Sequence, residues 1–143
     1  MHEEEAAEKV EKGWIRARAF IEVMAIKEEA AEKALKNHVN KIGKEEGIEI
    51  YKKDFDEPEF VENPPTQKAS EAYSQIVEIE FVVSSVKNLM TFSMLYGPSS
   101  VEVIEPDSLE IKVDELQDMA NSAAALIHQY ASQGAGGMVT SPD

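Results

Sequence analysis

The sequence predicts an α+β fold in which one antiparallel sheet carries helices on a single face. Stretches with apolar residues at every second position alternate with stretches whose apolar residues recur every three or four positions. These stretches form two similar β-α-β halves, and one more helix follows them. This order is typical of a ferredoxin-like βαββαβ sandwich with an additional C-terminal helix. We therefore expect the strand order 4-1-3-2 and an open second sheet face.

The length and composition favour one self-sufficient domain. A chain of 143 residues, 43% of them hydrophobic, can bury a core without covalent staples. No cysteine is present, so disulfides and thiolate metal sites are excluded. We expect a charged N-terminal segment over 1–13, a single ferredoxin-like domain over 14–132 and a disordered tail over 133–143. Within the first segment, a frayed helix over 3–12 should end at Gly13 without being buried.

The first half contains two strands and one helix. Ile15–Ala25 alternates between an apolar face and an amphipathic face, as expected of a long strand. Lys27–Lys44 has the apolar spacing of a helix and begins with acidic residues that suit its positive end. Ile48–Phe55 alternates again and predicts an edge strand. Residues 56–70 contain three prolines and several acids, which predicts a long loop.

The second half repeats this order. Tyr73–Val83 alternates most regularly and predicts the other central strand. Val86–Tyr96 follows a capping serine and predicts an apolar helix that ends at Gly97–Pro98. Val101–Ile104 predicts the last strand, and Val113–Ser132 predicts the additional helix.

The outward faces of the two central strands form the first candidate site. In the predicted order, Arg16 and Arg18 lie opposite Glu78 and Glu80, which gives complementary charges across the strands. Large apolar side chains share this face, and such a surface is expected to pack on another subunit, receive the last helix or bind a ligand. The candidate ligand or interface surface comprises Arg16, Arg18, Phe20, Met24, Ile76, Glu78, Glu80 and Ile104.

The last helix carries the second candidate interface. Its apolar residues repeat at alternating spacings of three and four, at Leu116, Met119, Ala123, Leu126 and Tyr130. This pattern predicts either a short coiled-coil seam between subunits or a helix packed on its own sheet.

Catalytic, cofactor and metal sites have no clear signature. His2, His38 and His128 are scattered and lack metal-ligand spacing. The acids at 54, 56, 57, 59 and 62 lack the glycine turn of a calcium loop, so a solvated loop is favoured over a cation site. Glu78 and Glu80 could act as paired carboxylates in acid–base chemistry, or form a structural charge ladder with the arginines. We predict no catalytic residue, metal or cofactor.

The charge excludes several classes of partner. The chain has 28 acidic and 14 basic residues and a net charge of −14, which repels nucleic acid and anionic membranes. No apolar run approaches the ~20 residues that span a bilayer. The acidic N-terminus is unlike a signal peptide. We therefore expect a cytoplasmic protein that binds neither nucleic acid nor membrane.

Residues 86 to 130 carry the nearest thing to a family signature. An apolar helix ends in glycine at Leu95-Tyr96-Gly97, and the strand Val101-Glu102-Val103-Ile104 follows it. An acidic residue with proline, Glu105-Pro106, and then Leu109 come after the strand. This segment resembles the WCX domain, the C-terminal extension that follows WYL domains in bacterial transcriptional regulators. The resemblance implies a ferredoxin-like fold. Because the chain has no helix-turn-helix or WYL segment, it also implies a sensor or oligomerisation module, not a DNA-binding protein.

These observations favour a non-enzymatic module that binds a ligand or a protein, as a sensor or in oligomerisation. We expect a homo-oligomer and allow a small-molecule effector. One alternative is a small enzyme with a site between subunits that uses Arg16, Arg18, Glu78 or Glu80. The other is an RNA-binding sheet, for which Phe20 and Trp14 are the only candidate stacking aromatics and which the charge opposes.

Overall fold

The computed structural model describes residues 2–62 and 71–132. The strands are β1 (Ile15–Ala25), β2 (Ile48–Phe55), β3 (Glu59–Glu62), β4 (Glu71–Val83) and β5 (Ser100–Glu105). The helices are α1 (Glu3–Glu11), α2 (Glu28–Gly43), α3 (Val86–Tyr96) and α4 (Val113–Ser132). Contacts divide the chain into two compact units, Met1–Ser108 and Leu109–Asp143. We describe each by itself.

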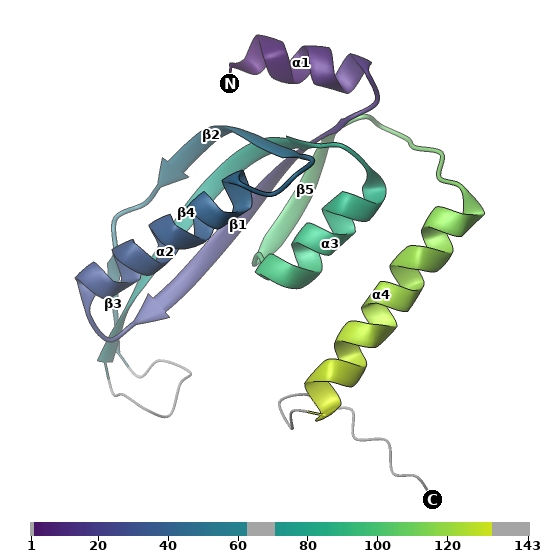
Figure 1. The fold of residues 1–143 in the computed structure, drawn as a ribbon. Helices are drawn as coiled ribbons and strands as arrows, with labels where there is room; N and C mark the ends of the chain where they lie inside the picture. The colour runs from purple at the N-terminus through teal and green to yellow at the C-terminus, as the bar shows by residue number, and fades with distance from the viewer. Residues whose placement is uncertain (1, 63–70, 133–143) are drawn as a thin grey trace, which may run out of the picture. The chain divides into compact units, whose positions relative to one another are not determined.

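The sheet has the predicted ferredoxin-like topology. Its strands are ordered β2-β4-β1-β5, and every pairing is antiparallel. The two central strands are β1 and β4, which pair without interruption from Ile15 opposite Val83 to Ala25 opposite Tyr73 (Figure 1). The predicted strand order and the long central pair are therefore confirmed.

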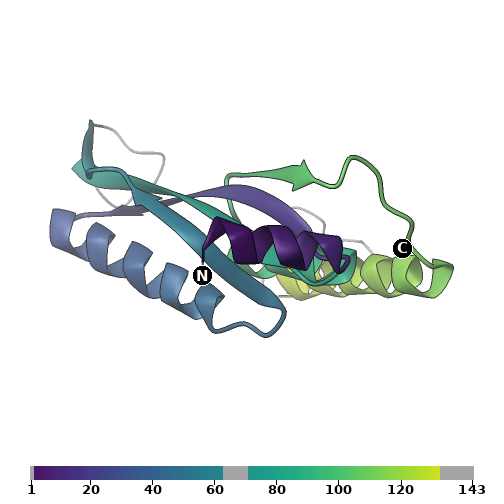
Figure 2. The same ribbon diagram turned by 90° about the horizontal axis from the view of Figure 1, so that it is seen from above.

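The core lies between the sheet and the two helices α2 and α3, which both cover one of its faces (Figures 1 and 2). Alternate residues of β1 and β4 point into it, and α2 contributes the side chains that recur on its inner face. Phe92 of α3 packs on Phe81 of β4 with ring centroids 5.0 Å apart. The buried cluster comprises Ile15, Ala17, Ala19, Ile21, Leu35, Val39, Ile42, Ile48, Val77, Ile79, Phe81, Val83 and Phe92.

The N-terminal helix α1 is more than the frayed, unburied helix that we expected. It lies against β1 and β4, and its Ala6 has no exposed surface. That prediction was wrong because Ala6, a single small side chain, allows the backbone of a charged helix to approach the sheet closely.

A short strand, β3, lies within the segment that was predicted to be a loop. Glu59–Glu62 pairs with the first residues of β4, with Phe60 opposite Tyr73 and the two rings 5.6 Å apart. The prolines of this segment flank the strand and do not interrupt it, so each of its residues can join the ladder. The strand β4 begins two residues earlier than predicted and supplies the partner.

The ends of α3 are set by its capping residues. Ser85 is the N-cap, and its side chain accepts a hydrogen bond of 3.0 Å from the backbone N–H of Asn88. Gly97 ends the helix in the left-handed conformation, with φ 55°. Both features agree with the serine and glycine signals in the sequence.

The second unit contains α4, with the bounds that the sequence predicted. The predicted tail over 133–143 lies outside the described residues. In the part of the chain that the structure describes, no helix combines the length and apolar character needed to cross a membrane.

Candidate functional site

The face of the sheet opposite α2 and α3 brings charged residues of four strands into rows. In an antiparallel sheet, residues that pair across strands share one face, so the register assigns each row. One row runs across the sheet through Glu102 of β5, Arg18 of β1, Glu80 of β4 and Lys52 of β2. Its charges alternate in sign, which favours pairing along the whole row.

Glu80 is the centre of this charge ladder. Its Oε2 atom lies 3.7 Å from Nη2 of Arg18 and 3.4 Å from Nζ of Lys52. Nη1 of Arg18 reaches outward to Oε2 of Glu102 at 2.9 Å. The side chain of Glu80 is only 8% exposed, so these cations compensate a carboxylate that is largely removed from water.

A β-bulge in β2 adds a hydroxyl group to the ladder. The register shifts between Ile50 and Lys52, so that Tyr51 and Lys52 both face Glu80. The Tyr51 hydroxyl donates a hydrogen bond of 2.9 Å to Oε1 of Glu80. The same hydroxyl accepts a hydrogen bond of 2.6 Å from Nε of Arg16. Tyr51 therefore couples Arg16 to the carboxylate that Arg18 contacts directly.

The helix α1 covers the neighbouring row, which runs through Arg16, Val82 and Glu49. Glu3 of α1 lies 3.8 Å from Arg16 at one end of the row, and Lys9 lies 3.1 Å from Glu49 at the other. The six-residue step from Glu3 to Lys9 rises about 9 Å along the helix. This rise is close to the roughly 9.5 Å that separates the outer two of three neighbouring strands, so α1 can reach both ends of the row. Val82, at the centre of the row, has no exposed surface. The open face is therefore covered at this end.

The electrostatics of Glu80 favour a structural ion over a proton acceptor. Burial alone would raise its pKa, but the hydrogen bond from Tyr51 and the charges of Arg18 and Lys52 outweigh burial. The net result is a pKa below the ordinary glutamate value. A general base works best with a pKa near the working pH, and this environment moves Glu80 away from that range.

The uncovered part of the face carries an apolar stripe with acidic borders. Phe20 of β1 is opposite Glu78 of β4, which in turn is opposite Asp54 of β2. Ile76 and Met24 continue the stripe diagonally, since Ile76 pairs with Glu22 and Met24 with Ser74. We call this surface the open-face patch, and it comprises Phe20, Glu22, Met24, Asp54, Ile76 and Glu78.

The carboxylates of this patch are only partly balanced. Among the described residues, neither Asp54 nor Glu78 forms a salt bridge, although they face each other directly across two strands. Opposed like charges destabilise a sheet. Glu22 accepts a hydrogen bond from the Ser74 hydroxyl.

The predicted surface residues divide between the charge ladder and the open-face patch. Arg18 and Glu80 belong to the charge ladder, and the Tyr51 hydroxyl joins Arg16 of the neighbouring row to it. Phe20, Met24, Ile76 and Glu78 belong to the open-face patch. Ile104 lies in β5 at a second register shift, where β5 passes from Val103 opposite Ala17 to Glu105 opposite Arg16. Sequence reasoning did not assign five residues to the ladder or the patch: Glu22, Tyr51, Lys52, Asp54 and Glu102. The strand register contained the signal for all of them except Tyr51, which the bulge displaces.

The predicted helix interface lies entirely on α4, in the second unit. Met119 is buried, Leu116 is 52% exposed and Tyr130 is 49% exposed. Ala123 and Leu126 are intermediate. Its role as a seam between subunits stays a prediction.

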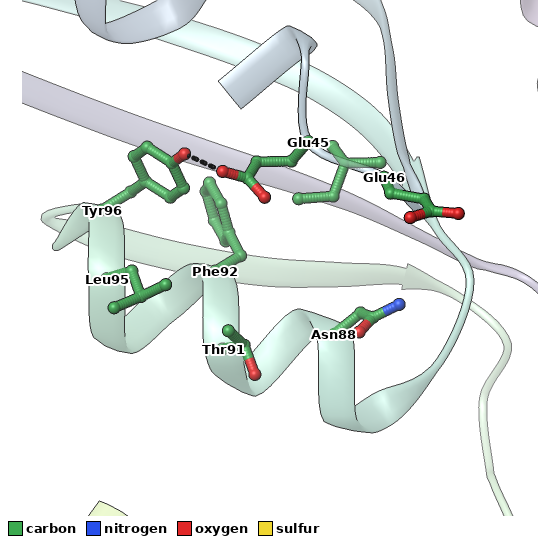
Figure 3. A pocket seen from close by; sticks show the side chains of 8 residues that line it. Glu45, Glu46, Asn88, Thr91, Phe92, Leu95 and Tyr96 are labelled. Atoms are coloured by element: carbon green, nitrogen blue, oxygen red, sulfur yellow. Dashed lines mark hydrogen bonds between the residues drawn. The ribbon is translucent and has the colours of Figure 1, made fainter. Parts of the chain in front are cut away.

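A small pocket lies on the other side of the sheet, where α3 meets the turn that follows α2 (Figure 3). The Tyr96 hydroxyl and the Glu45 carboxylate point toward each other above Phe92 and form a hydrogen bond of 2.5 Å. The pocket has a volume of about 40 Å³, which leaves room for ordered water. A more open hollow of about 510 Å³ lies beside Trp14, Gly47 and Asn88, so the small-molecule effector stays a prediction.

The two remaining predictions of chemistry concern histidines and metals. His38 packs edge to face on Tyr96, and its Nε2 atom lies 3.0 Å from the Tyr96 carbonyl oxygen. In this position His38 packs between α2 and the end of α3. Among the described residues, His, Cys, Asp and Glu side chains form no group of three that could hold a metal ion.

Tyr96 offers a direct test of the pocket geometry. Burial, the hydrogen bond to Glu45 and the Glu45 charge raise the pKa of Tyr96 to about 12. The folded state thus holds this proton more tightly than the unfolded state. Its contribution to stability is complete below the ordinary tyrosine value of 10.0 and is lost as the pH rises toward 12. We subtract the ultraviolet titration curve of Tyr96→Phe from that of the wild type. The difference should show one tyrosine that ionises at a pH near 12. A midpoint near 10 would contradict the pocket geometry.

Comparison with known proteins identifies a family. Searches of curated proteins and of solved structures found no match. The family model described as the MJ0538 family matches residues 16–141, which include β1 from its second residue onward and every element that follows it. The chain belongs to the MJ0538 family.

Proposed function

We propose that this protein is a non-catalytic binding module whose open-face patch receives a basic segment of another protein. The observation that carries this proposal is the apolar stripe of Phe20, Ile76 and Met24 beside the opposed carboxylates Asp54 and Glu78. Met24 is 38% exposed, and Phe20 and Ile76 are partly exposed. Exposed apolar surface with a polar rim is typical of interaction sites.

The charge of the patch selects the chemistry of the partner. Lysine or arginine side chains would relieve the repulsion between Asp54 and Glu78, and an arginine could also stack on Phe20. The net charge of −14 would steer a basic segment toward the protein and raise its association rate. The same charge opposes nucleic acid on this face, which supports a protein partner over the RNA alternative.

The charge ladder supports this proposal as a scaffold. Glu80 holds β1, β2 and β4 together through Arg18, Lys52 and Tyr51. Arg18, Glu80 and Lys52 are engaged with one another within the sheet, whereas the outer acid Glu102 remains 63% exposed. Among the described residues, Asp54 and Glu78 form no salt bridge, which leaves their carboxylates for a partner. The resemblance to a sensor or oligomerisation module is compatible with such a role.

A charge-reversal pair tests the proposal. The probe is a fluorescent peptide in which lysine and valine alternate, and its binding to the full chain is measured by anisotropy. Asp54→Lys combined with Glu78→Lys should weaken binding about tenfold, because two attractive contacts become repulsive.

The matched control is Glu62→Lys combined with Glu71→Lys. These carboxylates also oppose each other across two strands, but on the other face of the sheet. The control changes the net charge equally, so it should reduce affinity only slightly. Equal losses in both double variants would attribute binding to the overall charge and overturn a specific site.

A further inference from the structure

The edge strand β5 has one face that is apolar and one that is acidic, and both are accessible. Val101 and Val103 pair with Ala19 and Ala17, which places them on the side of α2 and α3. They are nevertheless 37% and 46% exposed. Glu102 lies on the opposite side, opposite Arg18, and its side chain is 63% exposed.

The outer edge of β5 is available for pairing within the sheet described here. The strand lies at the end of the order β2-β4-β1-β5 and pairs only with β1 among the described strands. An edge strand presents a row of backbone N–H and C=O groups that can bind a further strand. Its six residues span roughly 20 Å, enough for a short extended peptide.

From this alternation we propose that β5 binds an extended segment of a partner protein in which basic and apolar residues alternate. The segment adds to the sheet as a new edge strand. Its basic side chains face Glu102 and Glu105, and its apolar side chains pack on Val101 and Val103. This inference rests on the proposed function and specifies how the partner binds.

Charge distinguishes this occupant from a second copy of the chain. If two β5 strands paired symmetrically, the two sheets would join along six residues of each strand. Glu102 and Glu105 of both copies would then lie close together on the same face of the joined sheet. Like charges on paired strands oppose that association, and each copy adds a net charge of −14. Acidic edge residues that prevent self-pairing do not hinder a basic strand.

The added strand would also reach the open-face patch. Ser100 lies opposite Phe20 at the start of β5. Because serine is small, a basic side chain on the new strand could extend over Ser100 toward the ring of Phe20. One segment could therefore use both the β5 edge and the open-face patch.

Backbone methylation of the peptide tests strand addition separately from charge. Alternate amides of a strand point to opposite edges, so methylating the lysine amides blocks one edge and methylating the valine amides blocks the other. Both peptides keep every side-chain charge and the same number of methyl groups. Binding to isotope-labelled full-length protein is followed by amide chemical shifts.

We expect shift changes in Ser100–Glu105, and we expect one methylated isomer to bind about tenfold more weakly than the other. A Glu102→Lys variant should lose binding of the unmodified peptide. If both isomers bind equally and shifts map to Phe20, Ile76 and Glu78, strand addition is overturned while the proposed function stands. If no peptide binds, both proposals fall. Symmetric dimer formation through β5 would overturn this inference alone.

Discussion

Replacing Gly47 with alanine is expected to lower the free energy of unfolding by about 3 kcal/mol. Gly47 has φ +83°, a conformation that costs a residue with a Cβ atom. An added Cβ would also lie 2.7 Å from both Nδ2 of Asn88 and Oγ of Ser84. Those atoms form a hydrogen bond of 2.6 Å, so both side chains must shift to relieve the contact and this bond would be distorted. Urea unfolding measures the loss.

Gly97→Ala is the matched control for this substitution. Gly97 also has a positive φ, 55°, but nothing lies within 4 Å of the position that a Cβ atom would take. This variant should lose only about 1 kcal/mol, the cost of the left-handed backbone. Equal losses at both positions would mean that the close contact between Gly47 and α3 contributes nothing.

Glu80→Gln is expected to destabilise the fold by roughly 2 kcal/mol. The amide keeps the volume of the carboxylate but removes the charge that holds Arg18 and Lys52. Glu78→Gln, two residues earlier on the same face, is the control. It should be neutral or slightly stabilising, since it relieves the repulsion with Asp54.

The pH dependence gives the Glu80 prediction a second readout. Because the folded state lowers the pKa of Glu80, its contribution is present above the ordinary value of 4.5. It is lost as the pH falls through the folded pKa. The difference in stability between wild type and Glu80→Gln should therefore shrink in acid. A difference that does not change with pH would contradict an ionised Glu80.

The enzyme alternative instead requires Glu80→Gln to abolish an activity and leave folding intact.

Much of the fold was predictable because its signals are long and regular. The uninterrupted alternation in β1 and β4 identified the central strands, and their pairing put Arg18 near Glu80. The strand β3 was missed because the prolines and acids of residues 56–70 predicted a loop. Phe60 and Val61 lie within that stretch and were not considered as strand residues. Ala6 was missed for another reason, since one small residue among charges has no periodic signal.

The candidate site was less predictable because it depends on register across several strands. Arg16, Glu78 and Phe20 could be assigned to a face by counting along β1 and β4. Tyr51 could not, because a regular two-residue period does not reveal a bulge. Lys52 and Asp54 were overlooked because β2 was considered only for its inward residues.

The bulge at Tyr51 and Lys52 also changes how this stretch should be compared among relatives. Before it, Ile48 and Ile50 point to the core, at even positions. After it, Phe55 packs against the core, at an odd position. A relative that lacks the extra residue of the bulge would therefore align with a single-residue gap here and still keep its downstream residues on the same faces. Family members should be aligned here by which residues face inward, because a gapless alignment to a relative without the bulge would match inward residues with outward ones.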